Sequence, residues 1–94
     1  ASSVFAFLRR GNEDDADVLV VANLTPAPHH AYRVGVPHAG RWAEILNSDA
    51  DIYGGSNMGN GGGAQTTAQA AHGFAQSVAL MLPPLAVVFL RHDR

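Results

Sequence analysis

The strongest constraint in this sequence is a series of six short apolar runs, none longer than seven residues, each closed by glycine, proline or polar residues. Runs of this length suit β-strands and are too short for stable independent helices. No strong amphipathic helical stripe lies between them. We therefore expect an all-β fold, an antiparallel β-sandwich of Greek-key type with six to eight short strands. The runs cover residues 4–8, 18–24, 32–36, 41–46, 77–82 and 85–90.

The pattern within the early runs predicts how each strand is covered. Residues 4–8 are apolar at odd and even positions alike, which predicts a strand that is covered on both faces. A polar stretch separates this run from 18–24, so we expect the two to pair as an antiparallel hairpin. Run 32–36 alternates between large apolar residues and arginine or glycine, which predicts one wet face.

The middle of the chain is less regular. The two faces of run 41–46 are mixed, so the sequence does not say which side carries Trp42. Six glycines in residues 54–63 predict a long loop, because glycine loses the most chain entropy in regular structure. The Ala- and Gln-rich stretch 64–71 has no apolar stripe with which to dock as a helix, and we expect a loop there too.

Composition narrows the class of protein. The 94 residues fit one domain, and the formal net charge of −2 comes with no basic run, so nucleic acid is not an expected partner. No apolar stretch approaches the roughly 18 residues of a membrane span. Cysteine is absent and no histidine cluster has zinc-ligand spacing, so we expect no metal or other cofactor. A cysteine-free chain without a signal peptide suits the cytoplasm.

Acidic residues gather in two places, and both favour a structural interpretation. Asp49 and Asp51 are able to share one strand face, and retaining glycosidic chemistry needs two carboxyl groups about 5 to 5.5 Å apart. They follow a strand end, however, where acids commonly accept hydrogen bonds in turns. The second group lacks the spacing of a calcium loop and is expected to be a solvated hairpin tip; it consists of Glu13, Asp14, Asp15 and Asp17.

The glycine-rich segment and the histidines carry no strong catalytic signature. Residues 54–63 lack the Gly-Lys-Ser/Thr ending of a phosphate loop, and Ser56 lacks the Gly-x-Ser-x-Gly elbow. Neighbouring residues in an extended chain point to opposite sides, so His29 and His30 are poorly placed to bind one metal. We expect surface positions for all five histidines, including His38, His72 and His92.

Three aromatic residues, Trp42, Tyr32 and Tyr53, are candidates for a glucan-binding platform or for a docking surface. A flat aromatic side chain grips the apolar face of a sugar ring while polar groups meet its hydroxyls. Because Trp42 is the only tryptophan, ordinary packing in the core or on a docking surface is the favoured interpretation of it.

Several motifs in order along the chain carry a family resemblance. They are Val-Gly-Val-Pro at 34–37, Gly-Arg-Trp-Ala-Glu-Ile-Leu-Asn-Ser-Asp at 40–49 and Tyr-Gly-Gly-Ser-Asn at 53–57. With supporting segments at 4–9, 72–73 and 80–86, the chain resembles, over nearly its whole length, the carboxy-terminal domain of bacterial 1,4-α-glucan (glycogen) branching enzymes of the α-amylase superfamily. The stretch 64–71 departs from the family pattern.

The resemblance implies an accessory, non-catalytic role. In this family a catalytic (β/α)₈ barrel lies upstream and packs against the domain, and the parent forms α-1,6 branches. The family's catalytic Asp, Glu and Asp belong to the barrel and match no position here, so no catalytic residue is expected in residues 1–94. The chain begins at Ala1 and is strand-like by Val4, so we expect a single domain excised from a larger branching enzyme.

Expected partners follow from the same resemblance. They are the catalytic barrel, against which the domain packs, and α-glucan as a candidate for direct binding. An isolated docking domain exposes an apolar patch, so we also expect concentration-dependent dimerisation of the free chain. Two other functions stay open: a self-sufficient carbohydrate-binding module using Trp42 and Tyr53, and a sandwich adaptor for a protein partner.

Overall fold

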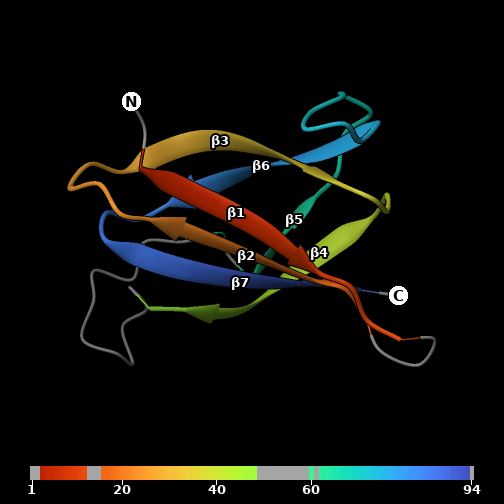
Figure 1. The fold of residues 1–94 in the computed structure, drawn as a ribbon, viewed down its shortest axis with the longest axis horizontal. Helices are drawn as coiled ribbons and strands as arrows, with labels where there is room; N and C mark the ends of the chain where they lie inside the picture. Colours follow the sequence, from red (N-terminus) through yellow and green to blue (C-terminus); the bar gives the residue numbers. More distant parts are fainter. Residues whose placement is uncertain (1–2, 13–15, 49–59, 61, 94) are drawn as a thin grey trace.

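The structure, a computed structural model, describes residues 3–12, 16–48, 60 and 62–93 (Figure 1). Among these residues there are seven β-strands and no helix, and hence no helix of a length and apolarity that would cross a membrane. Valine and leucine are frequent in the strands at 18–23, 76–82 and 86–92, as expected for residues that pack well on a pleated surface. The strands are β1 Val4–Arg9, β2 Val18–Asn23, β3 His29–Val36, β4 Arg41–Asn47, β5 Gly63–Gln65, β6 Gln76–Leu82 and β7 Ala86–His92.

The strands form two antiparallel sheets. The larger sheet has the order β1-β2-β7-β4-β5, and the smaller one pairs β3 with β6. The chain leaves the larger sheet after β2, returns for β4 and β5, and leaves again for β6 before β7 pairs between β2 and β4 (Figure 1). The predicted antiparallel sandwich is confirmed, as is the first hairpin, in which Val4 lies opposite Asn23.

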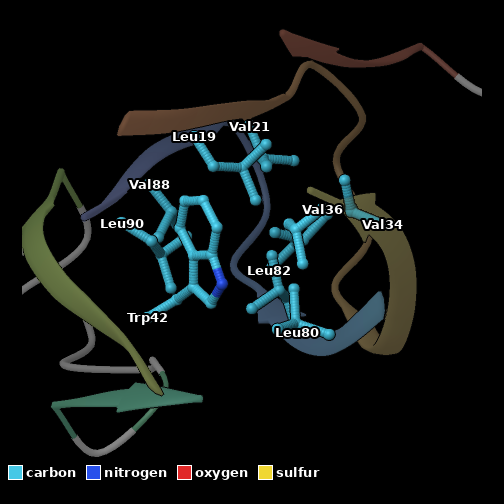
Figure 2. Close-up of a cluster of buried hydrophobic side chains, with 10 residues drawn as sticks. Leu19, Val21, Val34, Val36, Trp42, Leu80, Leu82, Val88 and Leu90 are labelled. Atoms are coloured by element: carbon cyan, nitrogen blue, oxygen red, sulfur yellow. The ribbon is translucent and has the colours of Figure 1, made fainter. Parts of the chain in front are cut away.

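The core lies between the two sheets (Figure 2). Every second residue of β2 and β7 points inward to meet every second residue of β3 and β6. Trp42 from β4 lies on the inner side with no exposed surface, which settles the face that the sequence left open. The core residues are Leu19, Val21, Val34, Val36, Trp42, Val78, Leu80, Leu82, Val88 and Leu90.

The first strand departs from expectation. Residues 4–8 were expected to be covered on both faces, but Phe5 is 60% exposed and Phe7 is 62% exposed. Val4 and Leu8, on the opposite face, do pack against the core. The prediction of a covered strand is wrong for this chain, because its described residues place a second layer on only one side of β1.

The prediction of a loop over residues 64–71 is also wrong in part. Ala64 and Gln65 belong to the edge strand β5, where Ala64 lies opposite Trp42 and Gln65 opposite Arg41. Backbone hydrogen bonds hold this strand in place, including one of 2.9 Å from the N–H of Thr66 to the carbonyl of Gly40. A three-residue strand held by its backbone leaves no apolar period in the sequence. Most of the predicted loop at 54–63 lies outside the described residues.

A tight turn after β5 folds over the C-terminal end of β3, at Gly35. Ala71 and Phe74 exchange two backbone hydrogen bonds, of 3.0 and 2.9 Å, and the backbone of Ala71 lies directly above Gly35. A methyl group built on Gly35 would come within 1.9 Å of the Ala71 carbonyl oxygen. The Gly35 N–H donates to Nδ1 of His72 at 3.1 Å. Gly35 is therefore buried although it belongs to the face that was expected to be wet.

Candidate functional site

The three candidate aromatic residues do not form a common platform in the described part of the chain. Trp42 is fully enclosed, and its indole N–H donates to the His38 carbonyl at 3.1 Å. Tyr32 is half-buried against the core and makes an edge contact with His29, at 5.6 Å between ring centroids. Tyr53 lies outside the described residues. An enclosed indole offers no face for a sugar ring, so Trp42 acts as a core residue in this conformation.

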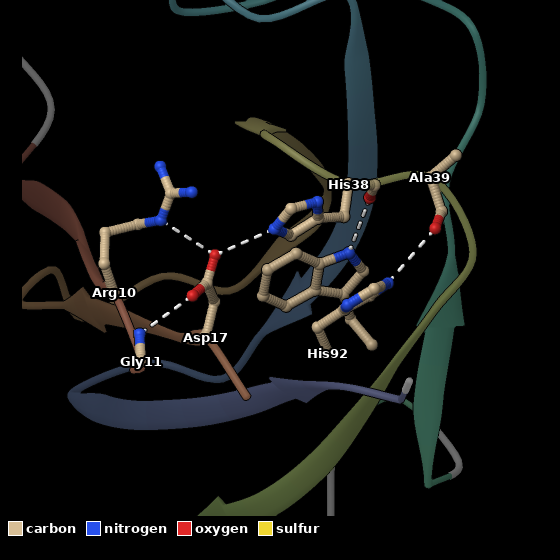
Figure 3. Close-up of polar contacts among 7 residues, drawn as sticks. Arg10, Gly11, Asp17, His38, Ala39 and His92 are labelled. Atoms are coloured by element: carbon tan, nitrogen blue, oxygen red, sulfur yellow. Dashed lines mark hydrogen bonds and ion pairs between the residues drawn. The ribbon is translucent and has the colours of Figure 1, made fainter. Parts of the chain in front are cut away.

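A buried carboxylate, Asp17, organises one end of the sandwich (Figure 3). Its side chain is only 8% exposed. One oxygen accepts a 2.9 Å hydrogen bond from the Gly11 N–H, and the other lies 2.9 Å from Nε of Arg10 and 3.1 Å from Nε2 of His38. The expectation that Asp17 belongs to a solvated hairpin tip is wrong, because these three partners replace its water; the other acids of that group lie outside the described residues.

The Asp17 cluster continues through stacked rings to the core. The His38 ring stacks on His92 at 4.9 Å, and His92 packs at a tilt against Trp42 at 5.1 Å. His92 also contacts the carbonyl of Ala39 through Nε2 at 3.1 Å (Figure 3). His92 is half-buried by these contacts and keeps part of its surface exposed. The sequence carried no signal for this cluster, because its members are far apart along the chain.

The environment of Asp17 sets the direction of its pKa. Burial alone raises the pKa of Asp17, and the hydrogen bond from Gly11 and the charge of Arg10 act against it. His38 adds to the lowering, so the pKa of Asp17 lies below its ordinary value of 3.8. A carboxylate with a lowered pKa stabilises the fold fully above its unfolded-state pKa, and that contribution is lost as the pH falls through the folded-state value.

We expect Asp17→Asn to destabilise the domain by about 1–3 kcal/mol near neutral pH, because the charge-assisted bonds to Arg10 and His38 are lost. The difference between variant and wild type should shrink as the pH falls below the unfolded-state value near 3.8. Urea unfolding over a pH series measures it. Asp93→Asn is the control, because Asp93 is 61% exposed and lies 3.9 Å from Arg41. A constant difference across the series would contradict the prediction.

The other polar candidates do not assemble a reactive site within the described residues. No group of three or more His, Cys, Asp or Glu side chains is placed to hold a metal in residues 3–12, 16–48, 60 and 62–93. Glu44 accepts hydrogen bonds from the backbone and side-chain nitrogens of Asn60, at 3.2 and 2.8 Å. Asp49, Asp51 and Ser56 lie outside the described residues.

The side of the larger sheet that faces away from β3 and β6, here called the outer face, is unusually apolar. Residues directly opposite one another in an antiparallel sheet share a face, so the register defines its rows. Two rows are entirely apolar, and a third carries an arginine on β1 and another on β7. The rows are Phe5, Ala22 and Val87; Phe7, Val20, Phe89 and Leu46; and Arg9, Val18, Arg91 and Ala43.

In the described structure this face is most open to water along β1. Val20 is buried but does not belong to the core between the sheets, because its neighbours on the outer face surround it. Phe5 and Phe7 remain more than half exposed. At the end of the face opposite the arginines, Leu24 follows β2 and Leu85 precedes β7, and they are 54% and 70% exposed. The sequence showed apolar runs on both faces, but only the register brings them into one surface.

Comparison with known proteins gives consistent matches. A family model described as the α-amylase C-terminal all-β domain matches residues 1–93. The chain is 62% identical over 92 residues to the 1,4-α-glucan branching enzyme GlgB of Pseudomonas fluorescens (strain Pf0-1), covering 98% of this chain and 12% of that protein. It is 58% identical over 89 residues to GlgB 1 of Xanthomonas axonopodis pv. citri (strain 306), covering 95% of this chain and 12% of that protein. The chain thus spans about an eighth of the length of these relatives.

Proposed function

Because this chain belongs to the family of α-amylase C-terminal all-β domains, we propose that it is the accessory, non-catalytic domain of a 1,4-α-glucan branching enzyme. The observation that carries the proposal is the match to branching enzymes over 95% or more of this chain, at 58% and 62% identity. The domain supports the catalytic region of the parent, and the parent performs the branching chemistry.

The described carboxylates support a non-catalytic role. Asp17 is held by Arg10 and His38, and Glu44 binds Asn60. Asp93, at the end of the last strand, lies near Arg41. Each of these described acids has a partner within the domain, whereas paired-carboxylate glycosyl chemistry requires two carboxyl groups free to act on one glycosidic bond. The chain thus resembles a support for a reactive site that lies elsewhere in the parent.

The test compares the parent enzyme, the parent without this domain, and the 94-residue chain alone. We expect no branch formation by the isolated chain, and a loss of thermal stability and activity in the shortened parent. Branches are counted from chain lengths after debranching of an amylose substrate. Branch formation by the isolated chain, or full activity and stability of the shortened parent, would refute the proposal.

A glycogen-containing gel separates this role from its rival, a self-sufficient carbohydrate-binding module. Unchanged migration of the isolated chain supports the structural role, whereas retarded migration supports direct glucan binding. Tyr32 is then the first described aromatic residue to substitute, because part of its ring is accessible while Trp42 is enclosed. Any such contact at Tyr32 lies on the smaller sheet.

A further inference from the structure

We infer that the outer face is the surface on which this domain docks against the preceding catalytic region of the same polypeptide. The matching surface of that catalytic region is apolar at its centre and carries carboxylates beside Arg9 and Arg91. The inference rests on the proposed function and extends it to a particular surface and partner chemistry. It concerns the two apolar rows and the arginine row defined by the register of β1, β2, β7 and β4.

The apolar rows need a cover that the described residues do not provide. The smaller sheet packs only on the inner face, where it meets Leu19, Val21, Val88 and Leu90. Phe5 and Phe7 stand on the other side with about three-fifths of their surface in water. A contiguous apolar patch of this kind marks an interaction surface, because exposed aromatic residues gain strongly from burial.

The arginine row indicates that the partner surface is negatively charged. Arg9 and Arg91 both lie opposite Val18, one on each side, so they are separated by two inter-strand spacings, about 10 Å. Both are exposed, and neither makes an ion pair with another described residue. Carboxylates on the partner fix the orientation of docking, since complementary charges set register and specificity.

The position of β1 favours the preceding region of the chain over a second copy. The family description places this domain at the C-terminal end, and β1, which carries Phe5 and Phe7, begins at Val4. A region joined just before β1 is held beside the outer face at a high effective concentration. A second copy presents the same arginines, and the described strand residues of its outer face include no carboxylate to pair with them.

The test uses the parent enzyme and the isolated chain side by side. Hydrogen exchange is expected to show slower exchange around Phe5, Phe7 and Phe89 in the parent than in the isolated chain. In the double variant Phe5→Ser/Phe7→Ser, protease should cut the domain away from the parent about tenfold faster than in wild type. The isolated variant chain should stay folded, lose little stability and self-associate less than wild type.

A second variant tests the charges, with a matched control. Arg9→Glu/Arg91→Glu should also speed release from the parent about tenfold at low salt, with a smaller effect at high salt because screening weakens the pairs. Ala79→Glu is the control, since Ala79 is exposed on β6 in the other sheet. This substitution should not change the rate of release at low or at high salt.

The outcomes separate this inference from the proposed function. Unchanged exchange of the outer face in a parent that still depends on this domain for activity would overturn the docking surface and leave the function standing. Protection of the outer face only in dimers of the isolated chain would overturn it in favour of a second copy. If protease releases the domain at the same rate from the Ala79→Glu parent and the Arg9→Glu/Arg91→Glu parent, the assignment of an acidic partner surface is overturned.

Discussion

Trp42→Ala is expected to destabilise the domain by about 3–5 kcal/mol, which is much of the total of about 5–15 kcal/mol available to a domain of this size. Trp42 has no exposed surface and is the largest fully buried side chain in the described core. Alanine leaves a cavity between the two sheets and removes the hydrogen bond to the His38 carbonyl. Denaturant unfolding followed by circular dichroism measures the loss.

Two comparison variants separate volume from polarity at this position. Trp42→Phe keeps part of the apolar volume but has no N–H for the His38 carbonyl, so we expect a smaller loss than for alanine. Phe5→Ala removes an aromatic ring that is 60% exposed and should change the free energy of unfolding by less than about 1 kcal/mol. A loss for Trp42→Ala as small as that for Phe5→Ala would contradict the assignment of Trp42 to the core.

Gly35→Ala is the second substitution with a large expected effect, about 2–4 kcal/mol. The added methyl would lie 1.9 Å from the carbonyl oxygen of Ala71 and 2.8 Å from its carbonyl carbon, so backbone has to move. The movement separates the turn at Ala71–Phe74 from β3 and breaks the hydrogen bond to His72. Hydrogen exchange of the Phe74 amide reports loss of the turn, and denaturant unfolding reports its cost.

Gly73→Ala is the matched control in the same turn. Gly73 has a φ of +81°, but a methyl there meets no atom within 4 Å, so only the strain of a left-handed alanine remains, about 1 kcal/mol. The comparison therefore isolates the steric clash at Gly35. If the two variants lose equal stability, close packing of the turn on β3 is not what requires glycine at Gly35.

The sequence predicts the strands whose side chains alternate or form continuous apolar runs. The alternation of Val78, Leu80 and Leu82 places β6 and its inner face correctly. It misses β5, since three residues held by backbone hydrogen bonds need no apolar period. The orientation of Trp42 depends on which face of β4 turns inward when β4 pairs with β7. This long-range pairing cannot be predicted from the residues near Trp42.

The candidate surface is predictable only in part. Apolar positions on both sides of residues 4–8 correctly indicate two apolar faces, but the described residues bury only the face of Val4 and Leu8. The alignment of Phe7 with Val20 and Phe89 follows from a register between strands about seventy residues apart, which local patterns do not determine. The burial of Asp17 leaves no mark in the sequence around it, because its partner His38 belongs to a distant turn.

The place of β7 has a consequence for how the domain is made. The strand that is synthesised last of the seven lies in the middle of the larger sheet, bonded to β2 on one side and to β4 on the other. The first hairpin therefore emerges from the ribosome well before β7, the strand that pairs with its second edge. Such late pairing between distant strands is slow and vulnerable to aggregation, so the larger sheet is completed only after β7 has been made.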